Sequence, residues 1–330
     1  MIIRSYPKVN ICLKITGFLG DYCEIASRFM LLKSANLYDT IEISQSENFK
    51  IEGNFDCKMS DNTIFRAKEA LKAFLKSKSD LKDSSRDSTN SNANSSISDE
   101  TQRVASETKQ KSGLRSHEQG NRTFSSIDEA SGKSPRFIAE RRICKCELDN
   151  FHIKVDKKIP AFAGLGGGSS NAASYILAMN EILELNLTPK DLAQIAKRVG
   201  ADVGFFVSGF SSANVFGVGE NVEFFNEKAL ELEIVTPPIE CSTKAVYDEY
   251  RSIKAKELKA NKEAQFFSDK RTLFELDSAT LMQKYSVDFL NDLYAPACKI
   301  YPQLAEFAKD GYFFSGSGSS FFRIKANRTK

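Results

Sequence analysis

The sequence has few side chains that could hold a metal ion. Its 330 residues include two histidines, His117 and His152, and seven cysteines that are scattered and odd in number. Cys144 and Cys146 are separated by one residue rather than by the two that are typical of zinc sites. This pattern argues against a structural zinc site and against a disulfide framework. We therefore expect reduced thiols and a cytoplasmic location.

Long apolar runs and a large charge imbalance are also missing. No stretch approaches the roughly eighteen consecutive apolar residues of a transmembrane helix, and the first residues do not resemble a signal peptide. The net charge of +3 gives no case for a nucleic-acid or membrane partner. The apolar fraction of 41% is sufficient for a sizeable core. The length suits two domains, or one domain with insertions.

The centre of the sequence has a glycine-rich loop. Residues 160–173 read PAFAGLGGGSSNAA. Residues 151–155 before the loop alternate in polarity and predict a strand, and residues 172–187 after it have the apolar spacing of a helix. A loop between a strand and a helix N-terminus presents backbone N–H groups and a partial positive charge, which together favour phosphate. Glycine permits the close approach of the ligand to the backbone.

Two common phosphate-binding motifs do not fit this loop. A P-loop continues with lysine before serine or threonine, whereas Ser169 and Ser170 follow the glycines directly. A dinucleotide-binding loop has an acidic residue about twenty positions later, at the end of the next strand. Here Glu184 falls inside the predicted helix.

The loop resembles the central motif of the GHMP kinases, the superfamily of galactokinase, homoserine kinase, mevalonate kinase and phosphomevalonate kinase. Residues 7–17, PKVNICLKITG, are similar to the first motif of one branch, the 4-diphosphocytidyl-2-C-methyl-D-erythritol kinases. Residues 315–320, SGSGSS, match the third GHMP motif, which packs beside the phosphate loop. Taken alone, the first segment is more typical of an edge strand with a solvated Lys8, and the last of a plain hairpin. The resemblance covers nearly the whole chain outside a low-complexity segment.

The resemblance also implies site residues. Residues 200–206, GADVGFF, match the signature that carries the catalytic base, which makes Asp202 the base and Lys8 its electrostatic partner. By pattern alone, Asp202 and Asn62 would be helix N-caps. The residues expected to bind ATP are Pro160, Ala161, Phe162, Ala163, Gly164, Leu165, Gly166, Gly167, Gly168, Ser169, Ser170 and Asn62. Ser169 or Ser170 could reach Mg²⁺ through its hydroxyl.

The acceptor side is expected to include Asn10, Tyr22, Cys23 and Tyr247. Tyr22 and Tyr247 would stack on the cytosine of the substrate. Cys23 stands where the branch usually has histidine. The implied ligands are ATP, Mg²⁺ and a small cytidine diphosphate compound. Oligomeric state is left open between a monomer and a weak dimer.

The resemblance implies an α+β fold with two domains. Residues 1–225 would form an ATP-binding domain like domain 2 of ribosomal protein S5, and residues 226–330 a ferredoxin-like domain. Residues 77–142 are rich in polar residues and predict a disordered or loosely helical insert without a catalytic role. Residues 251–265 predict only a solvated helix face.

The implied function is phosphorylation of the 2-hydroxyl of 4-diphosphocytidyl-2-C-methyl-D-erythritol by ATP, in the non-mevalonate isoprenoid route. One alternative is a GHMP kinase for another alcohol, such as homoserine or mevalonate. Another is a non-catalytic sensor on the same fold. The start at residues 7–10 together with Tyr22 favours the cytidine branch, and the presence of both Lys8 and Asp202 argues against a sensor.

Overall fold

The computed structural model describes residues 1–33, 35–55, 57–87, 145–259, 266–267 and 270–325. The chain divides into two compact units, residues 1–78 with 144–330 and residues 79–143. Most of the predicted insert, from residue 88 onward, lies outside the described residues. Its predicted disorder therefore stays a prediction. The first residues of the predicted insert, 77–87, form the end of helix α1 (Thr63–Asp87). The description that follows concerns the first unit.

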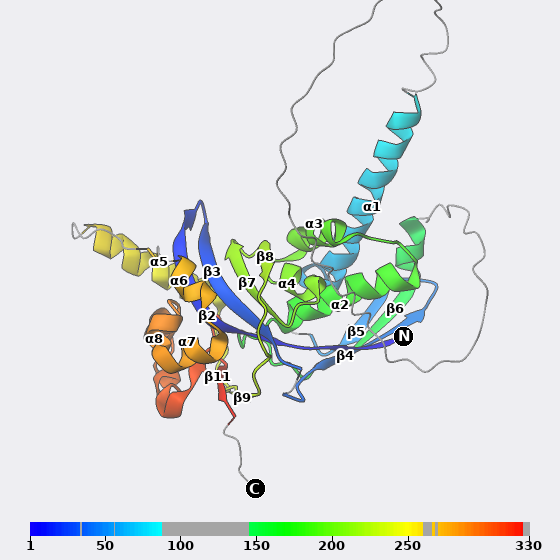
Figure 1. Ribbon diagram of the computed structural model, residues 1–330. Helices are drawn as coiled ribbons and strands as arrows, with labels where there is room; N and C mark the ends of the chain where they lie inside the picture. The colour runs from blue at the N-terminus through cyan, green and yellow to red at the C-terminus, as the bar shows by residue number, and fades with distance from the viewer. Residues whose placement is uncertain (34, 56, 88–144, 260–265, 268–269, 326–330) are drawn as a thin grey trace, which may run out of the picture. The chain divides into compact units, whose positions relative to one another are not determined.

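The described residues contain both strands and helices, often in runs of one kind (Figure 1). In chain order they are β1 (Ile2–Ser5), β2 (Lys8–Leu19), β3 (Tyr22–Leu31), β4 (Asp39–Gln45), β5 (Lys50–Gly53), α1 (Thr63–Asp87), β6 (Phe151–Asp156), α2 (Gly167–Ile182), α3 (Pro189–Val199), α4 (Val203–Ser208), β7 (Ser212–Gly217), β8 (Asn221–Phe224), β9 (Leu232–Val235), α5 (Thr243–Lys259), α6 (Lys270–Glu275), α7 (Ser278–Lys284), α8 (Val287–Leu290), α9 (Tyr294–Ile300), β10 (Phe313–Phe314) and β11 (Phe321–Ile324).

The strands form three sheets. The first has the order β1-β4-β6-β5, with β5 parallel to β6 and the other pairs antiparallel. The second, β2-β3-β7-β8, and the third, β10-β11-β9, are antiparallel throughout. Helix α2 packs on β1 and β4, whereas α7 and α8 pack on β2. This mixture confirms the predicted α+β class, while the domain boundary at residue 225 stays a prediction.

Strand β2 is more buried than its sequence pattern predicts. The apolar residues Val9 and Ile11 belong to a core cluster that includes side chains of α6 and α7. Lys8, Asn10 and Lys14 on the polar face are buried as well. The alternative of a solvated Lys8 is therefore wrong. Alternation reveals the apolar face of a strand, but it cannot reveal that other parts of the chain cover the polar face.

The helix after the glycine loop begins earlier than predicted. It starts at Gly167 rather than near residue 172 because Gly166, in the left-handed conformation, occupies the N-cap position. A Cβ atom on Gly167 would lie 2.8 Å from the Ile159 side chain, so the first turn packs too closely for a larger residue. The helix ends at Ile182, and Glu184 then adopts a φ of 49°. Helix α3 begins at Pro189, which stands in its first turn.

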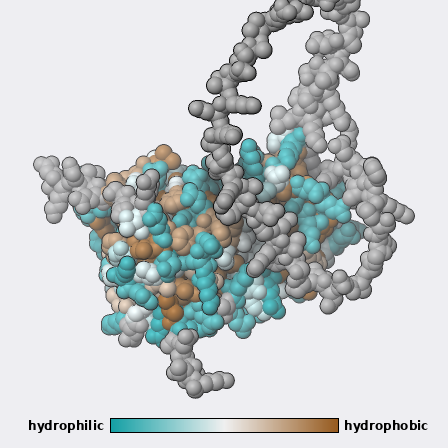
Figure 2. Space-filling model, in the orientation of Figure 1, coloured by the Kyte–Doolittle hydropathy of each residue, from teal (hydrophilic) through white to brown (hydrophobic). Residues whose placement is uncertain are grey.

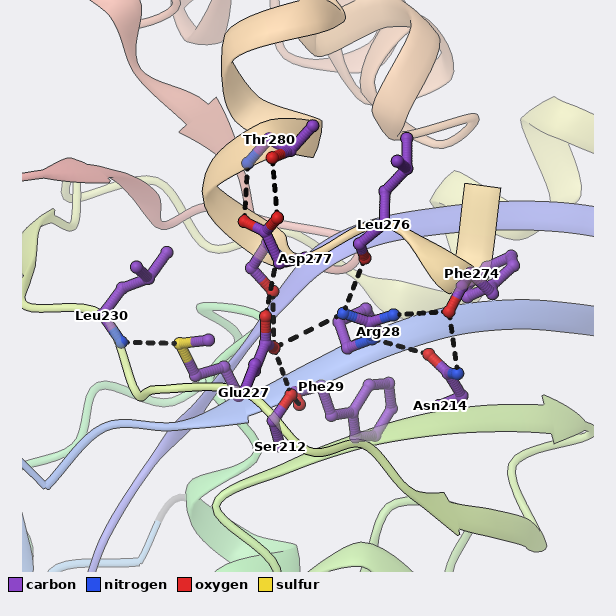
Figure 3. A network of polar contacts seen from close by, with 12 residues as sticks. Arg28, Phe29, Ser212, Asn214, Glu227, Leu230, Phe274, Leu276, Asp277 and Thr280 are labelled. Carbon is purple, nitrogen blue, oxygen red and sulfur yellow. Dashed lines mark hydrogen bonds and ion pairs between the residues drawn. The ribbon is translucent and has the colours of Figure 1, made fainter. Parts of the chain in front are cut away.

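A buried arginine ties the second sheet to the C-terminal helices (Figure 3). Arg28 on β3 is fully buried. Its Nε donates to Asn214 Oδ1 at 2.6 Å, and its Nη2 donates to the Phe274 carbonyl at 2.8 Å. Its Nη1 lies 3.4 Å from Glu227 Oε1 and 3.3 Å from the Leu276 carbonyl oxygen. The buried charge therefore has an ionic partner and several hydrogen-bond acceptors, as burial requires.

Glu227 extends this network to two serines. Its carboxylate accepts hydrogen bonds from the Ser212 hydroxyl and from both the backbone N–H and the hydroxyl of Ser278. The network holds β3, and the next residue along that strand, Phe29, lies beneath the Lys8 ammonium. The packing of the second sheet thus supports the polar cluster on β2.

Among the described residues, no helix is both long enough and apolar enough to cross a membrane. On the face drawn in Figure 2, hydrophilic and hydrophobic residues are mixed.

Candidate functional site

A cleft of about 1290 Å³ lies beside the glycine loop, and all the residues that line it belong to the first compact unit. Distant parts of the chain form its walls: β2 and β3, the segment before α1, residues 157–169, the residues before α4, and the first half of α5. Sites for a single small molecule usually have volumes of about 300–1,000 Å³. The cleft therefore has room for two substrates.

The glycine loop is locked against the third motif. Gly164 has a φ of 71°, and a Cβ atom there would lie 2.1 Å from the Ser315 carbonyl oxygen. The Ser315 hydroxyl donates to the Gly164 carbonyl at 3.1 Å. The Ser320 N–H donates to the Ala163 carbonyl at 3.1 Å. The predicted packing of the third motif beside the loop is confirmed, and it explains why glycine stands at residue 164.

The loop leads directly into the N-terminus of α2. The N–H groups of residues 167–169 have no carbonyl partner within the helix, as in any first helical turn. The helix dipole adds a partial positive charge at the same place. This end of the cleft can therefore bind an anionic group such as phosphate.

A buried lysine and a half-exposed aspartate meet beside the loop. Lys8 Nζ lies 3.2 Å from Asp202 Oδ2 and donates to Asn10 Oδ1 at 2.6 Å. The Lys8 side chain is 4% exposed and that of Asp202 30%. The Lys8 N–H also donates to the Leu165 carbonyl at 2.9 Å, which ties β2 to the loop. The ammonium is thus held in place, and the carboxylate is open to the cleft.

Asp202 lies at the N-cap position of α4, but its side chain makes no capping hydrogen bond. The alternative of a plain N-cap is therefore wrong. The carboxylate lines the cleft and is paired with Lys8. Its placement cannot be attributed to helix capping.

Two tyrosines predicted to bind the acceptor line the cleft. Tyr22, at the start of β3, is 69% exposed, whereas Cys23 beside it is buried. Tyr247 on α5 also lines the cleft. Burial, reinforced by the nearby negative charge of Asp202, raises the pKa of the Tyr247 hydroxyl. All four predicted acceptor residues, Asn10, Tyr22, Cys23 and Tyr247, therefore line the same cleft, and Tyr247 lies near both Asp202 and Cys23.

Residues 136–215 match the family model of the GHMP kinases N terminal domain. The chain is 38% identical to the 4-diphosphocytidyl-2-C-methyl-D-erythritol kinase of Sulfurimonas denitrificans, across 98% of this chain and 97% of the relative. The chain belongs to this kinase family. The Helicobacter pylori (strain J99) member is 33% identical, across 98% of this chain and 94% of its own length.

Solved structures agree with this family in fold. A crystal structure of 4-(cytidine 5'-diphospho)-2C-methyl-D-erythritol kinase has a TM-score of 0.60 at 21% identity, covering 98% of this chain and 90% of that one. The mevalonate kinase of L. major in complex with R-mevalonate has a TM-score of 0.53 at 12% identity, covering 99% of this chain and 88% of that one. The predicted GHMP kinase fold is confirmed.

The two serines after the loop face different surroundings. Ser169 lines the cleft. Ser170 is buried, and its hydroxyl donates to the Tyr6 carbonyl at 2.7 Å and lies 2.6 Å from the Ser5 hydroxyl. Both serines were predicted as contacts of a metal ion or a phosphate, and Ser169 is the one that faces the cleft. Ser170 instead fastens the start of α2 to the N-terminal segment.

Two predicted asparagines have structural partners. Asn62 lines the cleft, but its Oδ1 accepts hydrogen bonds from the Ile64 and Phe65 N–H groups at the start of α1. Asn10 also lines the cleft, and besides accepting from Lys8 it donates from Nδ2 to the Ser27 hydroxyl at 2.9 Å. A contact of Asn62 with ATP would therefore come from its amide nitrogen. Asn10 orients Lys8.

Four basic residues that line the cleft were not predicted as site residues: Arg66, Lys157, Lys244 and Arg251. Lys157 pairs with the fully buried Asp39, and its Nζ lies 3.5 Å from where a Cβ atom on Gly167 would stand. Because Lys157 stands only three residues before the loop begins at Pro160, the sequence could have predicted a cation near the loop. Arg251 on α5 also lines the cleft, so the prediction of a purely solvated helix face was wrong. Nothing in the local sequence signals this, because it depends on how α5 packs.

Proposed function

We propose that the protein transfers the terminal phosphoryl group of ATP to the 2-hydroxyl of 4-diphosphocytidyl-2-C-methyl-D-erythritol. This is the substrate named by the relatives, and the reaction belongs to the non-mevalonate route to isoprenoid precursors. The observation that carries the proposal is the Lys8–Asp202 pair, which opens onto the cleft beside the glycine loop. A sensor would need the fold and the loop, but not a carboxylate positioned next to an ammonium.

The glycine loop and the start of α2 hold the ATP phosphates. Phosphoryl transfer asks a protein mainly for positioning and for stabilisation of charge. The N–H groups of residues 167–169 supply fixed donors, and Lys157 supplies a nearby positive charge. Because these donors are part of the backbone and are already oriented, they need no rearrangement when the substrate binds.

Asp202 accepts the proton of the attacking hydroxyl. As the alcohol oxygen bonds to the terminal phosphorus, the bond from that phosphorus to the bridging oxygen breaks, and ADP leaves with the bond's electrons. A carboxylate can take the proton when it leaves late, after the oxygen has begun to bond. Lys8, whose Nζ lies 3.2 Å from Asp202 Oδ2, offsets negative charge that develops on the transferred group.

The residues of the cleft fit a magnesium ion delivered with ATP. Mg²⁺ prefers oxygen ligands and is usually held by one or two protein oxygens together with substrate phosphates and water. Ser169 and Asp202 both present oxygen atoms to the cleft. When bound, the ion would neutralise phosphate charge. Among the described residues there is no group of three or more histidine, cysteine or acidic residues, as a dedicated protein-only metal site would need.

The test is ADP release with Mg²⁺, ATP and a panel of alcohols that includes the cytidine compound, homoserine and mevalonate. We expect turnover with the cytidine compound and values of kcat/KM at least ~100-fold lower with the other two, because they leave the polar and aromatic acceptor end unfilled. Turnover of homoserine or mevalonate without the cytidine compound would replace this proposal by the second candidate, a kinase for another alcohol. No turnover of any alcohol would favour a sensor.

A further inference from the structure

Asn291, at the C-terminal end of α8, does not line the cleft but holds the backbone at the start of the third motif. The residue is 3% exposed. Its Nδ2 donates to the Phe314 and Gly316 carbonyls, both at 2.9 Å. Its Oδ1 accepts from the Leu293 N–H at 2.9 Å. The carboxamide therefore makes three hydrogen bonds, and two of them reach a turn that is distant in sequence.

The next residue, Asp292, fastens the same segment to β2. Its N–H donates to the Leu13 carbonyl at 2.9 Å, and its Oδ2 accepts from the Ile15 N–H at 2.7 Å. Its Oδ1 accepts from the Lys14 ammonium. Because Asp292 pins the backbone to β2, the Asn291 carboxamide beside it has a fixed place relative to that strand.

The turn that Asn291 holds lies against Asn10. Gly316 has a φ of 60°, and a Cβ atom there would lie 3.1 Å from Asn10 Oδ1. The Ser315 hydroxyl accepts from the Asn10 N–H at 3.3 Å. The pairing of β2 with β3 is irregular between Asn10 and Cys12, so the third motif supports β2 where the sheet is interrupted. It confines both the backbone and the side chain of Asn10.

Asn10 transmits this constraint to the catalytic pair. Its Oδ1 accepts from Lys8 Nζ at 2.6 Å, and the same ammonium lies 3.2 Å from Asp202 Oδ2. The ammonium has three donor hydrogens, so the acceptors around it decide where it points. A misplacement of about 1 Å in an active site can lower a rate about 100-fold, even when its cause is remote. A contact that fixes Asn10 therefore affects the rate of transfer.

We infer that Asn291 is a positioning residue for phosphoryl transfer. Its two donated hydrogen bonds hold the turn at Gly316 against Asn10, and Asn10 in turn orients the Lys8 ammonium. This inference rests on the proposed function, because it assigns Lys8 and Asp202 to the transfer step. Asn291 touches neither substrate, so it acts on kcat more than on KM.

The first experiment compares kcat and both KM values of the wild type with those of Asn291→Ala and Asn291→Asp, with ATP and the cytidine compound. Alanine removes all three hydrogen bonds. Ionised aspartate has nearly the same shape and still accepts from the Leu293 N–H, but it cannot donate to the two carbonyls. We expect both variants to lower kcat about 10- to 100-fold and to change each KM less than about threefold.

Asn180→Ala is the matched control. The Asn180 carboxamide also accepts from a backbone N–H, that of Leu187, at 2.9 Å, but it lies in the last turn of α2 and does not line the cleft. This variant should lower the melting temperature without changing kcat. A fall in kcat equal to that of Asn291→Ala would show that loss of stability alone causes it, and would overturn the inference.

A double-mutant cycle with Asn10→Ala shows whether Asn291 acts through Asn10. Residues that act as a unit have effects on kcat that do not multiply. In the Asn10→Ala background we therefore expect Asn291→Ala to lower kcat less than about threefold further. Effects that multiply would show that Asn291 acts on another part of the site, which would overturn the inference.

Other roles of Asn291 give other results. If the turn at Gly316 mainly supports the glycine loop, KM for ATP rises while kcat is kept, and the inference is wrong. Unchanged kcat in both variants contradicts it too. If Asn291→Ala does not fold, Asn291→Asp decides alone. A wild-type protein that does not turn over the cytidine compound contradicts the proposed function itself, and the alcohol of the panel that is turned over then takes its place in the comparison. An active wild type with an equally active Asn291→Asp contradicts only the inference.

Discussion

Asp202 precedes α4 without capping it, so a substitution there can affect chemistry without weakening the helix. We expect Asp202→Asn to lower kcat at least ~100-fold, the usual contribution of a general base. The dissociation constant for ATP should change little, because the carboxamide leaves the glycine loop untouched. Steady-state kinetics and ATP titration measure the two quantities separately.

A thermal melt supplies the control for this variant. The melting temperature of Asp202→Asn should stay close to that of the wild type, since no capping hydrogen bond is lost. Turnover near the wild-type rate in a folded variant would remove Asp202 from the role of base.

Glu227 balances the charge of the fully buried Arg28. Burial lowers the pKa of Arg28, and the carboxylate opposes this shift. Glu227→Gln leaves the buried cation without an ionic partner, and we expect the free energy of unfolding to fall by about 3 kcal/mol, the lower end of the cost of breaking a buried ion pair. Chemical denaturation measures it. Glu223→Gln, at an exposed position of β8, is the matched control, and an equal effect of the two substitutions would contradict the structural role of Glu227.

At the scale of elements, α3 has a reciprocal cap with a titratable member. The Thr188 hydroxyl accepts from the Asp191 N–H, and the Asp191 carboxylate accepts from the Thr188 N–H. The pKa of Asp191 is lowered, first by the hydrogen bond from Lys78 and then by those from Thr188. A lowered folded pKa stabilises the fold above the unfolded pKa of about 3.9. This contribution is lost as the pH falls through the folded value.

We therefore expect Asp191→Asn to reduce the free energy of unfolding by about 0.5–1 kcal/mol at pH 7, as is usual for a charge at a helix N-terminus. The difference from the wild type should shrink as the pH falls below about 4. Denaturation at a series of pH values measures it. Thr188→Ala removes an uncharged cap, so its effect should not shrink in this way. A pH-independent difference for Asp191→Asn would show that the charge does not contribute.

Local sequence patterns predicted the positions of strands and helices better than they predicted which side chains other parts of the chain would bury. Periodicity located β6 and most of α2, because the alternation or helical spacing there matches one buried face. It did not predict the burial of Lys8, which depends on the loop and α4 covering the polar face of β2. Nor did it predict that Arg251 lines the cleft, because that depends on the packing of α5 against the β2–β3 turn. Both failures concern tertiary contacts between segments distant in sequence.

At the scale of the whole molecule, the three motifs that were predicted to form one site each line a different wall of one cleft. Residues from Lys8 to Ser317 line it, so the site exists only when the entire first unit is folded. Pattern alone left Asp202 and Asn62 as possible caps. The structure separates them, since Asn62 caps α1 through its side chain, whereas Asp202 caps nothing.

The same arrangement predicts how the chain tolerates loss of its polar insert. All the residues of the cleft belong to residues 1–78 and 144–330, and the Lys78–Asp191 ion pair lies just before the second unit begins. Replacing residues 80–135 by a flexible glycine-serine linker should therefore leave kcat and both KM values within about threefold of the wild type, as for other changes outside the folded core. Shortening the connection also lowers its closure entropy slightly. The same deletion in the Asp202→Asn background controls for contaminating kinases. A deletion variant that folds, as judged by a cooperative melt, but lacks turnover would assign the insert a part in catalysis.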